Sequence, residues 1–510
     1  MDPGVRRSRA LAGMAAAVLL AIAGCGDAGV GAHADPSSAG GNWPAPNGDL
    51  SNTRHVGGPI DASSVARLHV AWTMPIGGYA TTPIVVDGVV YTQDLRSNVY
   101  ALDLHDGRVR WRHAYEEPNI GPNGVNVADG RVFGATTTHA FALDAGTGRE
   151  LWVRKLIRNK LEGIDMAPGY DDGTVYLSTV PAGLVSAYEG GARAVLWAID
   201  AATGRTKWKW AETPADLWGR PDVNSGGGLW HTPAFDRAGN VYISTANPAP
   251  IIGTKRFPWA SSRPGANRWT DSIVKLDTRT GHPVWARQVL PHDLYDWDLE
   301  CPVILRQVEG RSVALVAGKM GFVYEFDAAT GEQLWKRSVG LHNGHDDDNL
   351  RVLRGGAPPR MPDKILPGIL GGVETQMAAD ETTVYVPVNN LPAVVRSQTE
   401  ISVPNSVDGT GELVALDLAT GRVRWDRKLP QAEYGGATVV NDLVFTPTYE
   451  GTLWALDTRS GRIVWRSRLP AGTDAPVAVA GDTLLAAGSV PLEGGGMTEI
   501  VAYRLRARRP

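Results

Sequence analysis

The sequence predicts an all-β protein: an eight-bladed β-propeller of four-stranded blades with Trp-ended docking repeats, closed by the N-terminal strand. Three observations predict this fold. From residue 72 onward, an alternating apolar strand is repeatedly followed by Asp, a turn with Gly, and Trp eight residues after the Asp. Where no insertion intervenes, the repeat recurs at about forty residues, a period typical of propellers and solenoids. The two ends of the repeat region each resemble one part of a single unit.

The repeat has a simple physical interpretation as strand, tight turn and strand. Its copies are Asp103…Trp111, Asp144…Trp152, Asp200…Trp208, Asp277…Trp285, Asp327…Trp335, Asp417…Trp425 and Asp457…Trp465. Gly supplies the positive φ that the turn needs, and Asp can bond back to the turn backbone. Each Trp buries a large ring at a fixed place in its unit, which we expect to lie against the next unit. Four strands per unit favour a propeller.

The ends of the chain predict how the ring closes. Residues 68–72 look like the last strand of a unit whose earlier strands are missing, and this strand ends in Trp72. Residues 475–505 look like strands that lack a Trp strand. Joining the two ends makes one blade, so the N-terminal strand is expected to close an eight-bladed circle.

The first 42 residues have the pattern of an export and anchoring segment. A cluster of arginines precedes a small and apolar run over residues 11–24, which is too short to span a bilayer and fits a signal-peptide core. The ending Ile22-Ala23-Gly24-Cys25 resembles a bacterial lipobox, in which Cys25 becomes the lipidated first residue. An alternative interpretation is a buried apolar helix.

This pattern predicts three parts of the chain. Residues 1–24 are a lipoprotein signal peptide, and residues 25–42 are a flexible tether after lipidated Cys25, rich in Gly, Ala, Ser and Asp. Residues 43–510 are the propeller. The expected location is the cell envelope, with the protein anchored to the outer face of the membrane.

Composition excludes several kinds of partner and bond. The net charge of −4 and the absence of basic blocks exclude an electrostatic footprint for nucleic acid. After processing, Cys301 is the single remaining thiol, so no internal disulfide is expected, and Cys301 is interpreted as a small core residue. No Cys-x-x-Cys-His sequence occurs, so no c-type haem is attached.

The segment 291–299 is the part of the chain richest in chemical groups, with three carboxylates and two aromatic rings. If it runs as an extended strand end, Asp296 and Asp298 point the same way. Two carboxylates on one face repel each other unless a positive group lies between them, and a hard cation such as Ca²⁺ prefers such oxygen ligands. The alternative is a solvated acidic loop. The run 342–348 is also acidic and is interpreted as an exposed loop, with a second metal site as the alternative.

Several motifs together resemble the PQQ-dependent quinoprotein dehydrogenases, whose eight-bladed propellers carry the same Trp-ended repeat. The resemblance covers most of residues 43–510 and is strongest from Glu189 to Gly331. The motifs that carry it are Gly226-Gly227-Gly228-Leu229-Trp230, Ala234-Phe235-Asp236, Ala246-Asn247-Pro248-Ala249-Pro250, Asn267-Arg268-Trp269-Thr270 and His292-Asp293-x-x-Asp296.

The resemblance implies a role for particular residues. The family's metal ligands fall on Glu189, Asn247 and Asp296, and Asp298 matches an extra carboxylate of members that look like lanthanide users. Asp296 would also be the catalytic base. The implied cofactor-binding residues are Trp230, stacked on the quinone, Lys319, at its carbonyl oxygen, Ser186, and the family's Arg at Arg193. Each residue also has a structural interpretation, such as a surface charge, a loop starter, a packing Trp or a solvated blade edge.

The implied reaction is oxidation of an alcohol or sugar by hydride transfer to PQQ. Asp296 takes the hydroxyl proton as general base. A Ca²⁺ or lanthanide ion polarises the quinone carbonyl as a Lewis acid. Because no haem motif is fused, electrons are expected to pass to a separate acceptor.

Four positions depart from the family pattern. The adjacent cysteine pair that caps PQQ aligns with Glu117-Pro118, and an Arg that holds a PQQ carboxylate aligns with Asn123. A Glu becomes Ala80, and a Thr becomes Asp165. Because PQQ is a tricarboxylate, these changes should weaken binding, since each charge-assisted hydrogen bond is worth about 1.5–3 kcal/mol.

Two other function classes stay open on the sequence. One is a non-enzymatic propeller similar to lipoprotein scaffolds that help assemble outer-membrane proteins, and the other is a degenerate enzyme that binds a metal or ligand without oxidising it. An enzyme requires that Glu189, Asn247, Asp296 and Lys319 converge in one funnel. In a scaffold they would scatter.

Overall fold

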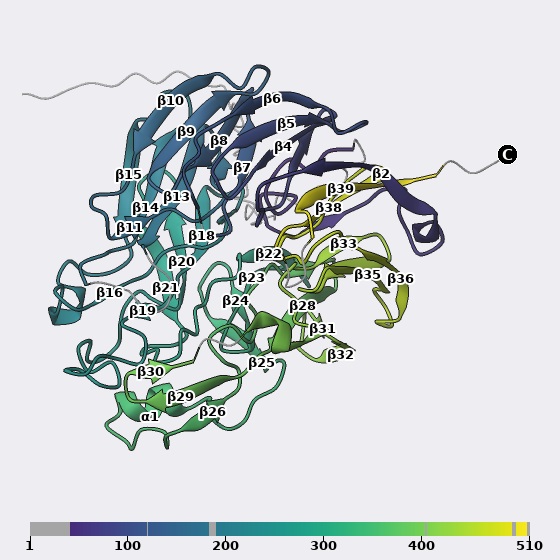
Figure 1. The fold of residues 1–510 in the computed structure, drawn as a ribbon. Coiled ribbons are helices and arrows are strands. Elements are labelled where there is room, and N and C mark those ends of the chain that lie inside the picture. The colour runs from purple at the N-terminus through teal and green to yellow at the C-terminus, as the bar shows by residue number, and fades with distance from the viewer. Residues whose placement is uncertain (1–40, 120, 183–189, 403–404, 492–495, 507–510) are drawn as a thin grey trace, which may run out of the picture.

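The computed structural model describes residues 41–119, 121–182, 190–402, 405–491 and 496–506, and these are almost entirely β-strand and turn (Figure 1). The predicted signal peptide, Cys25 and most of the tether lie outside the described residues. Among the described residues, no helix is long and apolar enough to cross a membrane. The one α-helix in this part of the chain is α1 (Asp348–Leu353).

The described residues form eight sheets of four or five antiparallel strands, apart from one parallel edge pairing. The first three of these sheets contain strands β3 to β15 in chain order. They contain β3 (Ile84–Val86), β4 (Val89–Gln93), β5 (Val99–Asp103) and β6 (Val109–His113); β7 (Val125–Ala128), β8 (Arg131–Ala135), β9 (His139–Asp144) and β10 (Glu150–Lys155); and β11 (Glu162–Gly163), β12 (Gly169–Asp171), β13 (Thr174–Pro181), β14 (Val195–Asp200) and β15 (Thr206–Ala211).

The next three sheets follow in chain order. They contain β17 (Ala234–Phe235), β18 (Asn240–Ser244), β20 (Ser272–Asp277) and β21 (Pro283–Gln288); β22 (Ile304–Val308), β23 (Arg311–Gly318), β24 (Phe322–Asp327) and β25 (Gln333–Ser338); and β27 (Ala378–Ala379), β28 (Thr383–Asn390), β31 (Thr410–Asp417) and β32 (Val423–Leu429). Insertions within them form two small sheets. These contain β16 (Ser225–Gly226) and β19 (Pro248–Ala249), and β26 (Asp363–Ile365), β29 (Ala393–Ser397) and β30 (Glu400–Ile401).

The last two sheets use both ends of the described chain. They contain β1 (His55–Val56), β33 (Thr438–Val440), β34 (Leu443–Pro447), β35 (Thr452–Asp457) and β36 (Ile463–Arg468); and β37 (Ala478–Ala480), β38 (Thr483–Gly488), β39 (Glu499–Leu505) and β2 (Leu68–Pro75). Strand β2 pairs antiparallel with β39, so the N-terminal strand supplies the Trp strand that residues 475–505 lack. The predicted propeller fold and its closure by this strand are confirmed.

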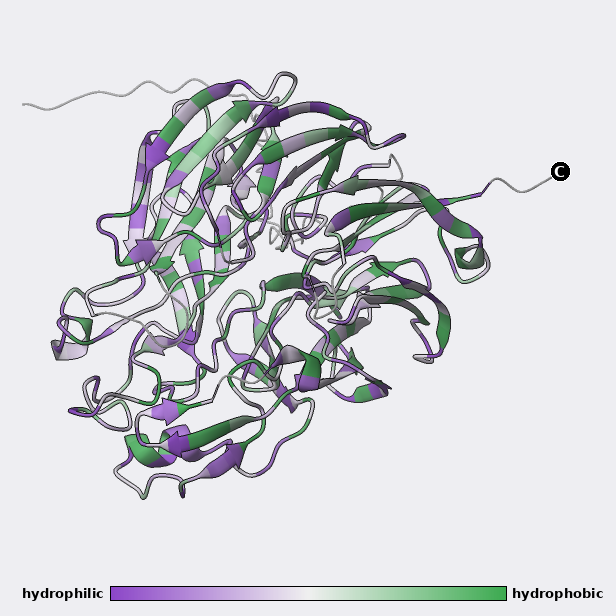
Figure 2. Cartoon of the chain, in the orientation of Figure 1, coloured by the Kyte–Doolittle hydropathy of each residue, from purple (hydrophilic) through white to green (hydrophobic). Residues whose placement is uncertain are grey.

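Burial decreases from the inner to the outer strands of each blade. The second strand β13 is buried along its whole length, whereas the fourth strand β15 alternates between half-buried and exposed residues. Inner strands are covered on both faces by neighbouring blades, so they are buried continuously, while an outer strand faces solvent on one side. Figure 2 shows hydrophobic and hydrophilic residues mixed along outer strands such as β10.

The repeat Trp docks on the turn of the next blade, as predicted, in seven of the eight blades; Trp465 instead packs edge-on against Tyr503. The indole N–H of Trp208, for example, donates to the carbonyl of Thr278 over 2.7 Å. Gly281 lies in the same turn with φ +72°, and a Cβ there would lie 2.4 Å from the Trp208 ring. The same arrangement joins Trp72 to Leu104, Trp111 to Ala145, Trp152 to Ala201, Trp285 to Ala328, Trp335 to Leu418 and Trp425 to Thr458.

The segment that precedes β1 joins the first strands of several blades. The carbonyls of Leu50, Ser51 and Thr53 accept hydrogen bonds from the N–H groups of Phe235, Leu305 and Ala379, which belong to three successive blades or border them. The next residue, Arg54, is fully buried and accepts from Val439 of a fourth blade through its own carbonyl. A short N-terminal segment therefore connects blades that are far apart in sequence.

Candidate active site

The loop between β21 and β22 places Asp296 in a central hollow of the propeller. Asp296 has φ +62°, so the loop turns sharply there and the extended strand end expected for residues 296–298 is not formed. The Asp293 carboxylate accepts hydrogen bonds from the N–H groups of Tyr295 at 2.8 Å and Trp297 at 2.7 Å. These bonds hold the backbone on both sides of Asp296.

Side chains of the insertion that contains α1 form hydrogen bonds with this loop. Asp348 accepts a hydrogen bond from the Tyr295 hydroxyl at 2.8 Å, and the Asn349 side chain accepts one from the Leu294 N–H at 2.9 Å. Asp348 is also paired with His345 over 2.7 Å. Its side chain is 1% exposed, so the prediction of an exposed loop at 342–348 is wrong at this end. Besides its neighbour His345, Asp348 is buried against Tyr295, which comes from a segment more than fifty residues earlier in the chain.

Lys319 lies between four carboxylates. It follows β23, and its ammonium is 2.7 Å from Asp298, 3.0 Å from Asp296, 3.9 Å from Glu374 and 4.0 Å from Glu300. Although residues 296–298 are not extended, the carboxylates of Asp296 and Asp298 do meet at one positive group. The solvated-loop alternative does not hold for these two residues, which are 5% and 1% exposed.

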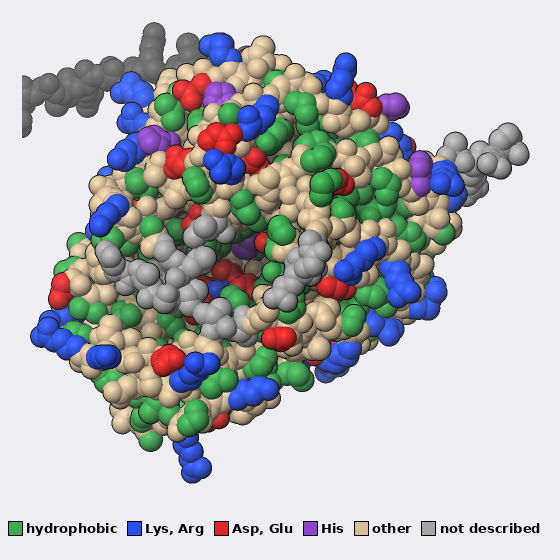
Figure 3. Space-filling model, viewed as in Figure 1, with side chains coloured by type: hydrophobic (Ala, Val, Ile, Leu, Met, Phe, Trp, Pro, Cys, Tyr) green, Lys and Arg blue, Asp and Glu red, His purple; other side chains and the backbone are tan. Residues whose placement is uncertain are grey.

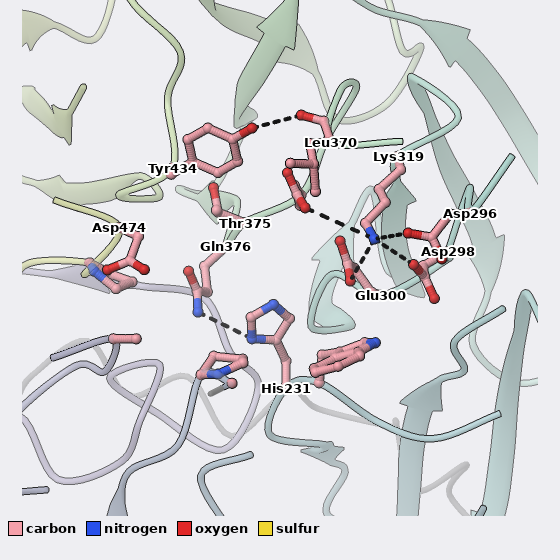
Figure 4. A pocket seen from close by; sticks show the side chains of 16 residues that line it. His231, Asp296, Asp298, Glu300, Lys319, Leu370, Thr375, Gln376, Tyr434 and Asp474 are labelled. Carbon is pink, nitrogen blue, oxygen red and sulfur yellow. Dashed lines mark hydrogen bonds and ion pairs between the residues drawn. The ribbon is translucent and has the colours of Figure 1, made fainter. Parts of the chain in front are cut away.

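These side chains line a cavity of about 220 Å³. Figure 3 shows the hollow with acidic side chains at its base, and Figure 4 shows Lys319 with its carboxylate partners on one wall and Asp474 on another. The lining residues with polar or aromatic side chains are Trp230, His231, Asp296, Asp298, Glu300, Lys319, Glu374, Thr375, Gln376, Tyr434 and Asp474. Lys319 is therefore the single Lys or Arg in the described lining, against five acidic residues.

Burial shifts the pKa values of the carboxyl groups around Lys319. It raises the pKa of Asp296 to about 6 and that of Glu374 to about 7, although the Lys319 charge opposes both shifts. Burial also raises the pKa of Glu300 well above its usual value. Burial alone would lower the pKa of Lys319, but the surrounding carboxylates raise it well above its usual value, so Lys319 stays charged.

Comparison with known proteins identifies the family of this propeller. A family profile described as "Glucose/ethanol/alcohol dehydrogenase, beta-propeller domain" matches residues 43–338, more than half of the chain. The chain belongs to this family. The resemblance to quinoprotein dehydrogenases is thereby confirmed. A second profile, "Outer membrane protein assembly factor BamB", matches residues 269–507 of this quinoprotein-family propeller.

Individual relatives agree with the profile. The chain is 27% identical to a quinohemoprotein alcohol dehydrogenase of Comamonas testosteroni over 81% of this chain and 67% of that protein. It is 26% identical to the lanthanide-dependent methanol dehydrogenase of Methylorubrum extorquens over 79% of each chain. The solved structure of the Comamonas testosteroni enzyme superimposes with a TM-score of 0.79 at 22% identity, covering 93% of this chain and 82% of that one, which shows the shared fold.

The quinoprotein-family propeller brings together only part of the residue set implied by the sequence. Trp230, Asp296, Asp298 and Lys319 all line the cavity. Asn247 is adjacent, because its backbone N–H donates to Asp298 over 2.7 Å. Ser186 and Glu189 lie outside the described residues.

Arg193 does not belong to the described lining of the cavity. Its guanidinium donates to the carbonyl of Thr213 over 2.5 Å. The backbone of Arg193 forms an isolated β-bridge with Gly226. This pairing places its side chain next to the turn that contains Thr213.

The four departures from the family pattern have different surroundings. Ala80 lines the cavity, and Asn123 lines a small adjoining one that also contacts Trp230. The Asn123 amide donates to the Asp94 carbonyl, while its side-chain oxygen is buried without a hydrogen-bond partner. Asp165 is buried with one unpartnered oxygen, and burial raises its pKa to about 6. Glu117 instead accepts a hydrogen bond from Thr138.

Sequence reasoning missed several cavity residues, of which Glu300 and Glu374 contact Lys319. Glu300 lies two residues after Asp298 and continues the alternation begun by Asp296 and Asp298, so its spacing was a usable signal. Glu374 comes from the segment before β27 and no pattern marks it. Asp474 lies between β36 and β37 and likewise reaches the cavity only through the closure of the ring.

Proposed function

We propose that this protein is a PQQ-dependent dehydrogenase that oxidises an alcohol or sugar. One observation carries the proposal: the carboxylates of Asp296 and Asp298, the ammonium of Lys319 and the ring of Trp230 line one buried cavity, with Lys319 bonded to both carboxylates. A scaffold would not require this convergence. The family and its alcohol-oxidising relatives support the same conclusion.

The residues present fit a metal ion and the quinone end of the cofactor. Asp296, Asp298 and the neighbouring Asn247 offer the oxygen atoms that Ca²⁺ or a lanthanide prefers. Trp230 offers a flat apolar face, and Lys319 a charged donor. The fit is poorer for the three PQQ carboxylates, because the described lining has no Lys or Arg besides Lys319, and Asp296 and Asp298 already engage it.

The chain's own residues account for the proton step. Asp296 accepts the hydroxyl proton of the substrate as general base, and a pKa of about 6 leaves it ionised at neutral pH. Lys319 fixes the orientation of this carboxylate over 3.0 Å. The buried walls exclude water and strengthen these interactions. When bound, PQQ supplies the hydride acceptor and the metal ion supplies Lewis-acid polarisation.

A titration tests this function. The purified protein is mixed with PQQ in the presence of Ca²⁺ or of La³⁺, and cofactor absorbance and dye-coupled alcohol oxidation are measured. We expect binding near one equivalent and turnover that falls at least 10²-fold in Asp296→Ala, the lower range for a general base. Asp347→Ala, at an exposed position outside the cavity, is the control. Absence of PQQ binding with either ion would contradict the proposal.

That negative result would favour the non-enzymatic alternative. The specific observation behind it is the match of residues 269–507 to an outer-membrane assembly factor. A scaffold would fold normally with Asp296→Ala and would bind neither PQQ nor metal in the cavity.

We further propose that the protein is exported, anchored through lipidated Cys25 to the outer face of the membrane, and passes electrons to a separate acceptor. The order of arginines, apolar run and Cys25 supports the anchor. Cys25→Ser should move the protein from the membrane to the soluble fraction. Unchanged membrane association of Cys25→Ser would rule out this anchor.

A further inference from the structure

Asp474 is a cavity carboxylate that lacks a positive partner. It lies between β36 and β37 and lines the cavity on a different wall from Lys319 and its carboxylates (Figure 4). Its Oδ1 atom accepts a hydrogen bond from the Ser489 hydroxyl over 2.7 Å, whereas its Oδ2 atom accepts none from the described residues. Burial raises the pKa of Asp474 to about 6, so the group is mostly ionised at neutral pH. In the described part of the chain no cation pairs with it, and its negative charge faces the cavity unbalanced.

Two neighbouring side chains also offer oxygen atoms without a donor. Thr375 and Gln376 line the same cavity. The Thr375 hydroxyl is buried and has no hydrogen-bond partner among the described residues. Gln376 places its side-chain nitrogen 3.3 Å from His231 Nδ1, and Figure 4 shows its oxygen pointing toward Asp474. This wall therefore presents three acceptor groups, of which Asp474 is charged.

The other side chains on this wall are neutral or aromatic. Burial lowers the pKa of His231 to about 4, so His231 is uncharged at neutral pH and does not neutralise Asp474. Tyr434 adds its ring to the lining, and Tyr449 packs against it edge-on, with the ring centroids 5.4 Å apart. The Tyr449 carbonyl accepts the N–H of Thr473 over 2.9 Å, which places this aromatic pair next to Asp474. Aromatic faces attract cations through the ring quadrupole.

We propose that Thr375, Gln376 and Asp474 form a subsite for a protonated amine, so that the substrate is an amino alcohol. This inference rests on the proposed function and names its class of substrate. A primary ammonium has three N–H donors and no acceptor, which matches three acceptor groups. It also supplies the positive charge that Asp474 lacks. The hydroxyl end of the same molecule is oxidised at Asp296, which lines the same cavity.

Charge distinguishes this ligand from other alcohols. The hydroxyl groups of a sugar or a plain alcohol can also donate to these oxygens, but they leave the charge of Asp474 unbalanced. A hydrogen bond between an ammonium and a carboxylate is about twice as strong as one between neutral groups. An alcohol that carries a carboxylate is repelled by Asp474.

A comparison of matched substrates tests the subsite. Aminopentanol and hexanol have the same length, and only aminopentanol is charged at neutral pH. Turnover of both is measured with the PQQ-loaded wild type and with Asp474→Asn. We expect kcat/KM for aminopentanol, relative to that for hexanol, to fall about tenfold or more in the variant, because one charge-assisted hydrogen bond is lost. Hydroxyhexanoate, with a negative charge at the same end, should be the poorest substrate of the wild type and should improve in Asp474→Asn.

Saturation-transfer NMR measures binding of the same compounds to the full-length protein without PQQ. We expect a signal from aminopentanol with the wild type that Asp474→Asn loses. Asp457→Asn is the matched control, since Asp457 also accepts a serine hydroxyl, that of Ser460, over 2.7 Å but lies outside the described lining. It should bind aminopentanol as the wild type does. Thermal melting checks that each variant is folded, and the isosteric Thr375→Val, with a smaller expected loss, replaces Asp474→Asn if that variant is unfolded.

Two results would overturn the inference. One is an unchanged ratio of aminopentanol to hexanol turnover in Asp474→Asn, and the other is an equal NMR signal from aminopentanol with the wild type and this variant. The proposed function fails separately, through absence of PQQ binding or of turnover with every alcohol. The NMR comparison then still decides whether the amine subsite exists.

Discussion

Asp293 lies three residues before the candidate base, and its carboxylate accepts N–H bonds from both residues that flank Asp296. Its backbone carbonyl in turn accepts a hydrogen bond from the buried Arg263. The geometry of Asp296 therefore depends on a neighbour that does not itself face the cavity. At the scale of the residue, the candidate catalytic carboxylate is positioned by backbone hydrogen bonds to Asp293.

Asp293→Asn should weaken both stability and activity, because an amide has one acceptor oxygen in place of two. Loss of one such bond costs about 1–3 kcal/mol when the donor is buried. Chemical denaturation and alcohol oxidation are the measurements. Asp61→Asn is the control, since a single oxygen of Asp61 accepts from the N–H groups of both Ser63 and Ser64, so the amide can keep both bonds there. If both variants lose equal stability, loss of the second acceptor oxygen is not the cause.

His292 predicts a dependence of stability on pH. Burial, with a contribution from the Arg263 charge, lowers its pKa to about 4, against about 6.5 in an unfolded chain. Between these values the unfolded state binds a proton that the folded state does not. Stability is therefore complete above about pH 6.5 and decreases as the pH falls to about 4, by up to about 3 kcal/mol.

His292→Gln removes this titration. We expect the free energy of unfolding of the wild type to fall faster than that of the variant between pH 6.5 and pH 4. Parallel curves for the two proteins over that range would contradict the prediction.

At the scale of the element, the Trp and Gly of the repeat act as a pair between blades. The Trp ring occupies the space that a Cβ on the next blade's Gly would need, and its N–H satisfies a carbonyl in the same turn. Both residues of the pair can be recognised in the sequence, because they recur at fixed spacing within each unit.

Gly281→Ala should destabilise the protein more than Gly130→Ala. Both glycines have similar positive φ, +72° and +69°, so both variants lose about 1–2 kcal/mol from backbone strain. Only at Gly281 does the new methyl group meet a Trp ring, which adds about 1–3 kcal/mol of overpacking. Thermal and chemical denaturation measure the difference. Equal losses would show that the docking contact adapts without cost.

At the scale of the whole molecule, Arg54 ties the ends of the ring together. Its guanidinium is fully buried and donates to the carbonyls of Ala437 at 2.7 Å and Val477 at 2.6 Å, which precede two different blades. It also donates to Asn47, Thr82 and Thr438. Burial without a carboxylate partner lowers its pKa to about 9.

Arg54→Met should destabilise the whole propeller, because several buried acceptors lose their donor at about 1–3 kcal/mol each. The free energy of unfolding in guanidinium chloride is the measurement. Arg396→Met, at a 61% exposed side chain, should change stability by less than about 0.5 kcal/mol. A small effect at Arg54 would mean that the N-terminal segment is not required for closure.

The sequence by itself determined the propeller, the Trp docking, the closing strand and the segment that carries Asp296 and Asp298. These features depend on residues at short, regular spacing, which is visible along the chain. It also marked Trp230 and Lys319 through the resemblance, yet the same resemblance implied a cofactor contact for Arg193, which bonds to Thr213 instead.

Only the tertiary structure decided which other groups share the cavity. Glu374, Asp474 and His231 come from different parts of the chain, and Arg54 reaches blades almost four hundred residues away. The buried role of Asp348 likewise depends on Tyr295, from the preceding blade connection. No local pattern encodes such contacts, because they arise when separate blades close into a ring and bring their loops to one axis.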